Sequence, residues 1–418
     1  MEVNGMNYKI LPLLLLCLKP SYAEERYITS EGTYIIPDSN KSWGRTNDPK
    51  IMHNNLILFQ SIGNRKKPPK TCETPASLAC LYSLTKQVPG CPIKGTTAVP
   101  KGGWGAIAVV EAYHNPYAEK DLKVFSEEFG LPLCTKANGC FSVVHTGNHI
   151  PPFNAASADE HVLDIEWAHA MAPNAKIIMV EAQNESFEEH IKAIHLASQQ
   201  VAASGGGLVS ISWSISEFPE EKNYDAFFQT PGIVYIASSG DYSAPARYPS
   251  SSPYVISAGG TSVIRDVQGN FLMETAWSTN PDTPVGEKSG GSGGPSLYES
   301  RPAFQNSVMR IVGKARGTPD ISFNADPKTG VCVYSTVHGG WLKDGGTSVS
   351  APALAGIINS ANRRAKTTQE ELTYIYNSAI KNYHAYWHDI LEGNNGFPAL
   401  VGYDFVTGLG SPRSYKGK

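Results

Sequence analysis

Short apolar runs alternate with segments of helical periodicity between residue 99 and the end of the chain. The runs are rich in β-branched and aliphatic residues and have the length of buried strands. Strands that alternate with helices favour an α/β fold with a mainly parallel central sheet flanked by helices. The predicted strands are residues 106–112, 141–145, 175–182, 208–214, 232–238 and 254–258, and the predicted helices are residues 158–172, 186–203 and a third helix from 353 onward.

Residues 24–98 lack this alternation and are poorly periodic, which predicts an N-terminal extension or a short pro-segment. The segment 286–298 is rich in glycine and serine and predicts a loop. At the start of the chain, Lys9 precedes the run ILPLLLLCL, and small residues before Glu24 offer a cleavage site. This pattern predicts a secretory signal peptide over residues 1–23. We therefore expect a signal peptide (1–23), an extension (24–98) and one large domain (99–418), in a protein that is secreted or periplasmic.

Charge and length narrow the class of protein. The 418 residues carry a formal net charge of −3, and only 17% of them are charged. The absence of a basic excess argues against nucleic acid as a partner. The apolar run near the N-terminus is too short for a comfortable membrane span, so we expect no stable membrane insertion. Protein or peptide substrates remain as the expected partners, and we expect a monomer.

Six cysteines remain once the predicted signal peptide is removed, and an even number in an exported protein predicts disulfides. The short separations favour Cys80–Cys91 and Cys134–Cys140 as local pairs. Cys72 and Cys332 then either pair with each other or stay reduced. No C-x-x-C spacing supports a metal site at these cysteines.

The run GGTSVSAPALAG at residues 345–356 contains the strongest candidate for a nucleophile. Ser348 stands at the start of a predicted helix, where free N–H groups and the helix dipole favour negative charge. Pro352 fits the first turn of such a helix. The alternative is that Ser348 is an ordinary N-capping serine. A nucleophilic serine also needs a base, and His161 and His169 are better explained as surface or packing residues.

Three carboxylates offer acid–base chemistry. Glu160 and Asp164 are four residues apart and therefore lie on one face of the predicted helix. Apolar neighbours can shield this pair, so that the two pKa values separate. Asp241 follows a predicted strand, and polar residues at the carboxyl ends of parallel strands line functional crevices. The alternatives are a solvated acidic face for the pair and a turn residue for Asp241.

Asp389 and Asp404 flank the loop segment GNNGFPALVG, which suggests a cation site of carboxylates and backbone carbonyls. The alternating acidic spacing of an EF-hand is absent. A plain turn-rich loop is the alternative.

In chain order, the motifs EHVLD (160–164), SGD (239–241), GGTSVSAP (345–352), Asp389-Ile390 and GYDFVTGLGSP (402–412) resemble those of the sedolisins, or serine-carboxyl peptidases. The resemblance covers roughly residues 99–412 and implies a subtilisin-like three-layer fold. It implies that Ser348 is the nucleophile, that Glu160 is the general base, and that Asp164 holds and polarises Glu160. Asp241 would be a protonated oxyanion donor. Two further residues would extend the network behind the carboxylates, namely Glu111 and Trp213.

The resemblance also implies one Ca²⁺ ion, bound by the side chains of Asp389 and Asp404 and by the carbonyls of Ile390, Leu400 and Gly402. Because a carboxylate base and a protonated carboxylic acid must coexist, we expect most activity at acidic pH. Two alternatives remain for the function: a catalytically silent, peptidase-like binding protein, and a histidine-dependent serine hydrolase of the subtilisin type. The sequence does not reveal cleavage specificity or whether residues 24–98 are removed.

Overall fold

The computed structural model describes residues 25–28, 32–36, 51–61, 65–278, 289–361 and 363–418, so the predicted signal peptide lies outside the described residues. In this part of the chain, eight strands form the central sheet, in the order β13-β12-β10-β8-β5-β7-β6, with β16 paired to β12. Its pairings are parallel except for β12 with β13. The strands are β5 (Ala106–Ala112), β6 (Phe141–His145), β7 (Lys176–Ala182), β8 (Gly207–Ile211), β10 (Ile233–Ser238), β12 (Ile256–Arg265), β13 (Phe271–Ala276) and β16 (Ile321–Asn324).

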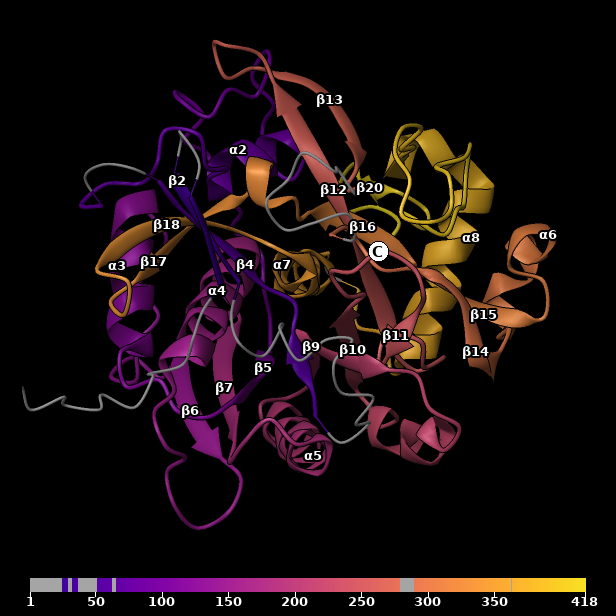
Figure 1. Cartoon of the computed structure of the whole chain (residues 1–418), viewed down its shortest axis with the longest axis horizontal. Coiled ribbons are helices and arrows are strands. Elements are labelled where there is room, and N and C mark those ends of the chain that lie inside the picture. The colour runs from indigo at the N-terminus through magenta and orange to yellow at the C-terminus, as the bar shows by residue number, and fades with distance from the viewer. Residues whose placement is uncertain (1–24, 29–31, 37–50, 62–64, 279–288, 362) are drawn as a thin grey trace, which may run out of the picture.

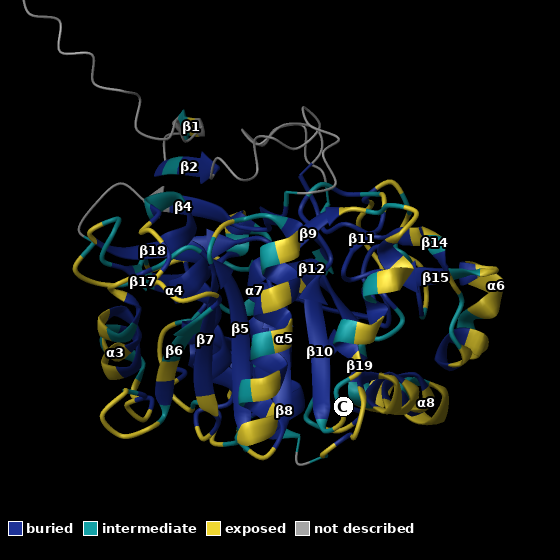
Figure 2. Cartoon of the chain, turned by 90° about the horizontal axis from the view of Figure 1, so that it is seen from below, coloured by how far each residue is buried: buried dark blue, intermediate teal, exposed yellow. Residues whose placement is uncertain are grey.

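Helices cover both faces of this sheet (Figures 1 and 2). Helix α5 (Phe187–Ala203) lies across one face, and α4 (Ala155–Met171) and α7 (Thr347–Ser360) pack together on the other. The three-layer fold and the mainly parallel sheet are thus confirmed. The remaining helices are α2 (Pro75–Leu81), α3 (Ala118–Phe129), α6 (Met309–Val312) and α8 (Thr368–Tyr386), with 3₁₀ turns at Glu221–Phe228, Ala303–Val308 and Pro327–Thr329.

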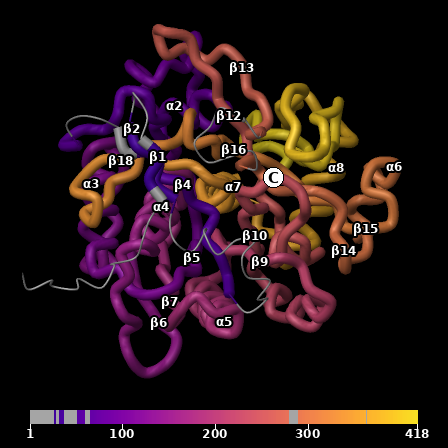
Figure 3. Tube along the Cα trace, viewed as in Figure 1, coloured from indigo at the N-terminus to yellow at the C-terminus, as the bar shows by residue number. Residues whose placement is uncertain are grey.

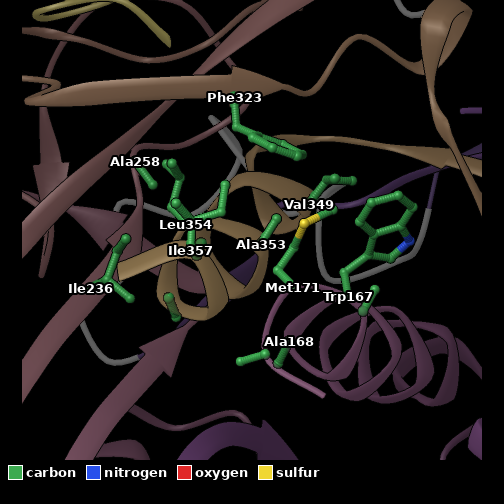
Figure 4. Packing of buried hydrophobic residues seen from close by; sticks show 14 of the residues in the cluster. Trp167, Ala168, Met171, Ile236, Ala258, Phe323, Val349, Ala353, Leu354 and Ile357 are labelled. Atoms are coloured by element: carbon green, nitrogen blue, oxygen red, sulfur yellow. The ribbon is translucent and has the colours of Figure 1, made fainter. Parts of the chain in front are cut away.

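The core between α4, α7 and the sheet is packed without room for larger residues. In Figure 4 the side chains of Val349 and Ala353 face those of Trp167 and Met171 across the helix interface. A Cβ atom on Gly356 would lie 2.5 Å from the Met171 Cβ atom, so the two helices approach as closely as a glycine allows. This contact fixes the position of the N-terminus of α7 relative to α4.

Smaller sheets surround the central one. An antiparallel sheet in the order β1-β2-β4-β18-β17 joins the N-terminal part of the chain to strands from near residue 340 (Figures 1 and 3). A second small sheet, β11-β9-β3, lies at the carboxyl ends of the central strands. The bounds are β1 (Glu25–Ile28), β2 (Gly32–Ile36), β3 (His53–Asn54), β4 (Ile57–Ser61), β9 (Trp213–Ser216), β11 (Arg247–Tyr248), β14 (Gly294–Ser300), β15 (Ala315–Thr318), β17 (Val331–Ser335), β18 (Gly340–Gly345), β19 (Trp387–His388) and β20 (Ser411–Pro412).

Three predictions about these elements were wrong in detail. The predicted strand 208–214 is broken at Ser212, because β8 ends at Ile211 and β9 turns away to pair with β3 and β11. The described end of the predicted loop 286–298 is strand β14, whose pairing with β15 is not visible in local sequence. Pro352 lies inside α7 rather than in its first turn, because the helix begins at Thr347.

All three disulfides form as the sequence allowed, namely Cys72–Cys332, Cys80–Cys91 and Cys134–Cys140. Among the described residues, no helix is both long and apolar enough to cross a bilayer.

Candidate active site

Ser348 is the second residue of α7 and is fully buried. The N-cap is Gly346, which has no side chain, so the alternative of an N-capping role for Ser348 is wrong. Gly346 has a φ of 104°, and a Cβ atom there would lie 2.1 Å from the carbonyl oxygen of Asn55. Only glycine fits this corner between β18 and α7. The first amides of the helix are used by other segments, because the Thr347 amide donates to Asp241 and the Ser348 amide donates to the carbonyl of Asn55.

Glu160 and Asp164 both lie on the face of α4 that meets α7, and both are fully buried. The alternative of a solvated acidic face is therefore wrong. Neither carboxyl oxygen of Glu160 has a hydrogen-bonding partner of good geometry among the described residues. Burial, and next the charge of Asp164, hold the pKa of Glu160 well above its usual range, while the nearby Ser348 hydroxyl lowers it. A buried carboxylate without a partner is a strong proton acceptor.

The Ser348 hydroxyl lies between two acceptors. It donates to the carbonyl oxygen of Ser212 over 3.3 Å, which is a long hydrogen bond. The Glu160 carboxylate is the other acceptor, because the Ser348 hydroxyl lies near enough to lower its pKa. Because a hydroxyl hydrogen rotates freely, Ser348 can turn its proton to Glu160 without moving the helix.

Asp164 is held by hydrogen bonds from Ser212. The Ser212 hydroxyl donates to both of its carboxylate oxygens, at 2.9 and 2.8 Å. Behind it lies Glu111, whose Oε2 atom accepts a 3.4 Å hydrogen bond from the Trp213 indole. Burial raises the pKa of both carboxyl groups, and the negative charges of Asp164 and Glu160 raise that of Glu111 further. Glu111 and Asp164 therefore titrate as a coupled pair, in which their hydrogen bond raises the pKa of Glu111 and lowers that of Asp164.

Asp241 follows β10 and reaches the N-terminus of α7. Its Oδ1 atom accepts hydrogen bonds from the amide and hydroxyl of Thr347, at 2.7 and 2.8 Å. Its Oδ2 atom is buried and has no partner among the described residues. Burial raises the pKa of Asp241 to about 8 against the opposing effect of Thr347. At neutral or acidic pH, Oδ2 is therefore the atom that carries the proton. Asp241 is no ordinary turn residue.

The two histidines of α4 are packing residues and not surface residues. His161 shares a hydrogen bond of 2.9 Å with the carbonyl of Ala112, and His169 shares one of 2.8 Å with the carbonyl of Pro132. Burial lowers the pKa of each imidazole to about 4, so both are neutral at physiological pH. Neither is placed to serve Ser348.

The structure gathers oxygen atoms in the predicted calcium loop. The Tyr383 hydroxyl lies within hydrogen-bonding distance of three acceptors, Asp389 Oδ1 at 3.0 Å and the carbonyls of Gly402 and Leu409 at 3.3 and 2.9 Å. Asp404 organises the same loop, because its carboxylate accepts the amides of Leu400, Val406 and Thr407. Carboxylate and carbonyl oxygens are the ligands that a hard cation prefers. Among the described residues, Asp389 and Asp404 do not belong to a cluster of three or more histidine, cysteine or carboxylate side chains.

Sequence reasoning missed Thr347 and Ser212 as members of the site. Thr347 stands directly before Ser348, so the GTS triplet already contained the signal. Ser212 gave no local signal beyond its place before Trp213, because its role depends on the break between β8 and β9. Asp344, at the end of β18, was also missed. Both of its buried carboxyl oxygens lack a partner among the described residues, and its charge acts on Glu160.

Comparisons with known proteins agree with this geometry. The sequence pattern of the subtilase family matches residues 147–403, more than half of the chain. The chain is 31% identical to kumamolisin from Bacillus sp. over 280 residues, which cover 60% of this chain and 48% of that protein. It is 36% identical to sedolisin from Pseudomonas sp. over 190 residues, which cover 43% of this chain and 31% of that protein. The matches thus span less than half the length of either relative.

The fold comparison points in the same direction. The structure of Pseudomonas sedolisin, a serine-carboxyl proteinase, superimposes with a TM-score of 0.68. The superposition covers 84% of this chain and 96% of that structure, at 22% identity, which shows a shared fold. The family pattern, these relatives and the shared fold give the same result. The chain belongs to the subtilase family and to its sedolisin branch.

Proposed function

We propose that the chain is an exported serine-carboxyl endopeptidase that is most active at acidic pH. The observation that carries the proposal is the meeting of Ser348 with an unpartnered buried carboxylate, Glu160, and an unpartnered carboxyl oxygen of Asp241. One group accepts a proton, one supplies the nucleophile and one donates to an oxyanion. The names of the relatives, sedolisin, kumamolisin and tripeptidyl-peptidase, support peptide substrates.

In the proposed mechanism, the Ser348 oxygen attacks the scissile carbonyl carbon while Glu160 takes the hydroxyl proton. Asp164, held by Ser212, stabilises and orients Glu160. The amide of Ser348 and the Oδ2 proton of Asp241 stabilise the oxyanion. Glu160 then gives its proton to the leaving amine, and water hydrolyses the acyl-enzyme by the same steps. Glu111 and Trp213 are positioning residues behind Asp164.

The proposal includes a bound Ca²⁺ ion that the side chains of Asp389 and Asp404 and the carbonyls of Ile390, Leu400 and Gly402 would hold. A cation there would stabilise the loop that precedes β20 and would take no part in the chemistry. A measurement of Ca²⁺ binding tests this part of the proposal. We expect Ca²⁺ to raise the melting temperature of the inactive Ser348→Ala protein and a chelator to reverse the rise. An unchanged melting temperature would reject this site.

The localisation and the division of the chain also belong to this proposal, with a signal peptide at 1–23, an extension at 24–98 and the peptidase domain at 99–418. The three disulfides support an oxidising compartment outside the cytoplasm.

The deciding experiment is casein hydrolysis from pH 3 to pH 7 by the wild type and by Ser348→Ala and Glu160→Ala variants. Both variants should be inactive yet folded. A matched control is His169→Gln on the same helix, which should keep its activity. Activity that needs a histidine and survives Glu160→Ala would favour a subtilisin-type hydrolase. No activity in a folded wild type would favour a silent binding protein.

A further inference from the structure

A segment of the chain itself crosses the candidate site. Strand β3 pairs antiparallel with β9, with His53 opposite Ser214 and Asn54 opposite Trp213. The pairing continues for one more residue, because the Asn55 amide donates to the carbonyl of Ser212 at 3.1 Å. Ser212 is also the residue that holds Asp164. The ladder therefore leads the chain in extended form directly to the proposed catalytic groups, as strand addition delivers a peptide to a sheet edge.

The carbonyl oxygen of Asn55 lies where an oxyanion would form. It accepts a 3.0 Å hydrogen bond from the amide of Ser348. A Cβ atom built on Gly346 would be 2.1 Å from this oxygen and 2.6 Å from Asp241 Oδ2, so both oxygens lie against the same glycine. Asp241 Oδ2 makes no hydrogen bond to the described residues, so a proton on this atom is free to donate. The Ser348 amide thus binds the Asn55 carbonyl, and Asp241 Oδ2 lies against the same glycine, where oxyanion stabilisation would place a second donor.

The side chain of Asn55 fills a pocket that matches a carboxamide. Its Nδ2 atom donates to the Ser238 hydroxyl at 2.7 Å and to the carbonyl of Ser212 at 3.3 Å. Its Oδ1 atom accepts a 3.1 Å hydrogen bond from the Ser214 hydroxyl. All of these residues are buried. Both ends of the amide are therefore recognised, and an apolar side chain of the same size would leave buried hydroxyls unpaired.

The chain continues in a fixed position beyond Asn55. Leu56 is fully buried, and β4 then pairs with β18, the strand that leads into Ser348. Ile57 lies opposite Gly345, and Leu58 lies opposite Asp344. The peptide bond between Asn55 and Leu56 is held on both sides, like a bound substrate rather than a released product.

We propose that residues 52–56 are an internal substrate, and that this peptidase cleaves after asparagine, beginning with its own Asn55–Leu56 bond. The inference rests on the proposed function. The Ser348 oxygen forms an ester with the Asn55 carbonyl carbon as the bond to the Leu56 nitrogen breaks. Glu160 transfers the Ser348 proton to that nitrogen. Water then hydrolyses the ester, which frees the Asn55 carboxylate and restores Ser348.

The first test follows the full chain itself. Wild-type protein and the Ser348→Ala variant are incubated at pH 5, and their N-termini are read by mass spectrometry. We expect a form that begins at Leu56 in the wild type and an uncut Asn55–Leu56 bond in the variant. Asn55→Leu should slow this cleavage by about tenfold or more. A processed wild type with Asn55–Leu56 intact would overturn the proposal.

The second test measures specificity on separate peptides, so that it does not depend on the folding of an Asn55 variant. Two fluorogenic peptides differ only by asparagine or the near-isosteric leucine before the cleaved bond. We expect kcat/KM to be about tenfold or more higher for asparagine, and Ser238→Ala to reduce that ratio. Equal rates, or a preference for leucine, would overturn the inference while leaving peptidase activity established. Failure to cleave casein as well would instead remove the proposed function.

Discussion

Thr347 holds one oxygen of Asp241 with two hydrogen bonds, from its amide at 2.7 Å and from its hydroxyl at 2.8 Å. Both bonds end on Oδ1, so the other oxygen is left for the proton. Burial raises the pKa of this carboxyl to about 8. The arrangement turns an aspartic acid into a hydrogen-bond donor over the neutral and acidic range.

Replacing Asp241 tests this donor. The active form is protonated, so wild-type kcat/KM should fall as pH rises through about 8. Asp241→Asn keeps a donor in place of Oδ2 and an acceptor for Thr347, so it should keep part of the activity and lose the alkaline decline. Asp241→Ala should lower kcat by about 10²- to 10³-fold. A pH profile of all three proteins decides, and an alkaline decline that persists in Asp241→Asn would reject the assignment.

Glu160 should control the acidic side of the same profile. A general base works only when ionised, and burial raises the pKa of Glu160 above its usual value. Activity should therefore be lost as pH falls through that raised pKa, and the maximum should lie in the mildly acidic range between the two limbs. Glu160→Gln should reduce kcat by roughly 10²- to 10⁴-fold at every pH.

The control for this experiment is Glu166→Gln, because Glu166 is also buried on α4 but accepts its hydrogen bond from the Tyr334 amide. It should preserve the acidic limb. If Glu160→Gln kept wild-type kcat, another group would have to be the base.

The local sequence pattern predicted most strands of the central sheet and the helices beside it. The reason is that strands buried on both faces are continuous apolar runs. Strand β5 is found at its predicted residues, 106–112. Helix α5 begins after Ser186, whose hydroxyl accepts the amide of Glu189. The spacing of Glu160 and Asp164 likewise placed both on one helical face.

Contacts between distant parts of the chain could not be predicted in this way. The pairing of His53 with Ser214 joins an unpatterned segment to a strand more than 150 residues away. No periodicity near residue 53 indicates it. The same holds for Ser212, whose hydrogen bond to Asp164 exists only because the strand breaks there. The proposed preference for asparagine depends on these long-range contacts.

The buried carboxyl groups should make the fold more stable in acid than in base. Burial raises the pKa of several of them well above the usual range, among them Glu111, Glu160, Asp164, Glu166 and Asp344. The folded state then holds more protons than the unfolded state at pH values between the two pKa values. The free energy of unfolding therefore falls as pH rises above about 4.5. A net charge of only −3 is too small to produce such a trend by general repulsion.

Thermal unfolding of the Ser348→Ala protein, which cannot digest itself, measures this trend. With Ca²⁺ held constant, the melting temperature should be about 5 °C or more higher at pH 4.5 than at pH 7.5. Glu166→Gln removes one titrating group and should narrow the difference. A higher melting temperature at pH 7.5 would contradict the assignment of protonated carboxyls to the core.

The disulfide Cys72–Cys332 should contribute more to stability than Cys134–Cys140. The first joins residues 260 positions apart, and the second joins residues only 6 apart. The entropy of loop closure in the unfolded chain predicts contributions of about 5.5 and about 2 kcal/mol, respectively. Cys72 also fastens the chain just after β4 to strand β17, where the Cys332 amide donates to the carbonyl of Glu73 at 2.9 Å. After cleavage at Asn55, this link would hold the new N-terminal strand in place.

Paired alanine variants of each disulfide, both in the Ser348→Ala background, test this ordering by chemical denaturation. Loss of Cys72–Cys332 should lower the free energy of unfolding by more than loss of Cys134–Cys140. Because β4 runs beside the strand that leads to Ser348, the active form of the Cys72 variant should also lose activity after self-cleavage, whereas the Cys134 variant should keep it. If both variants unfold at the same denaturant concentration, the long link does not restrain the unfolded chain, and the role of Cys72 as an anchor for β4 fails with it.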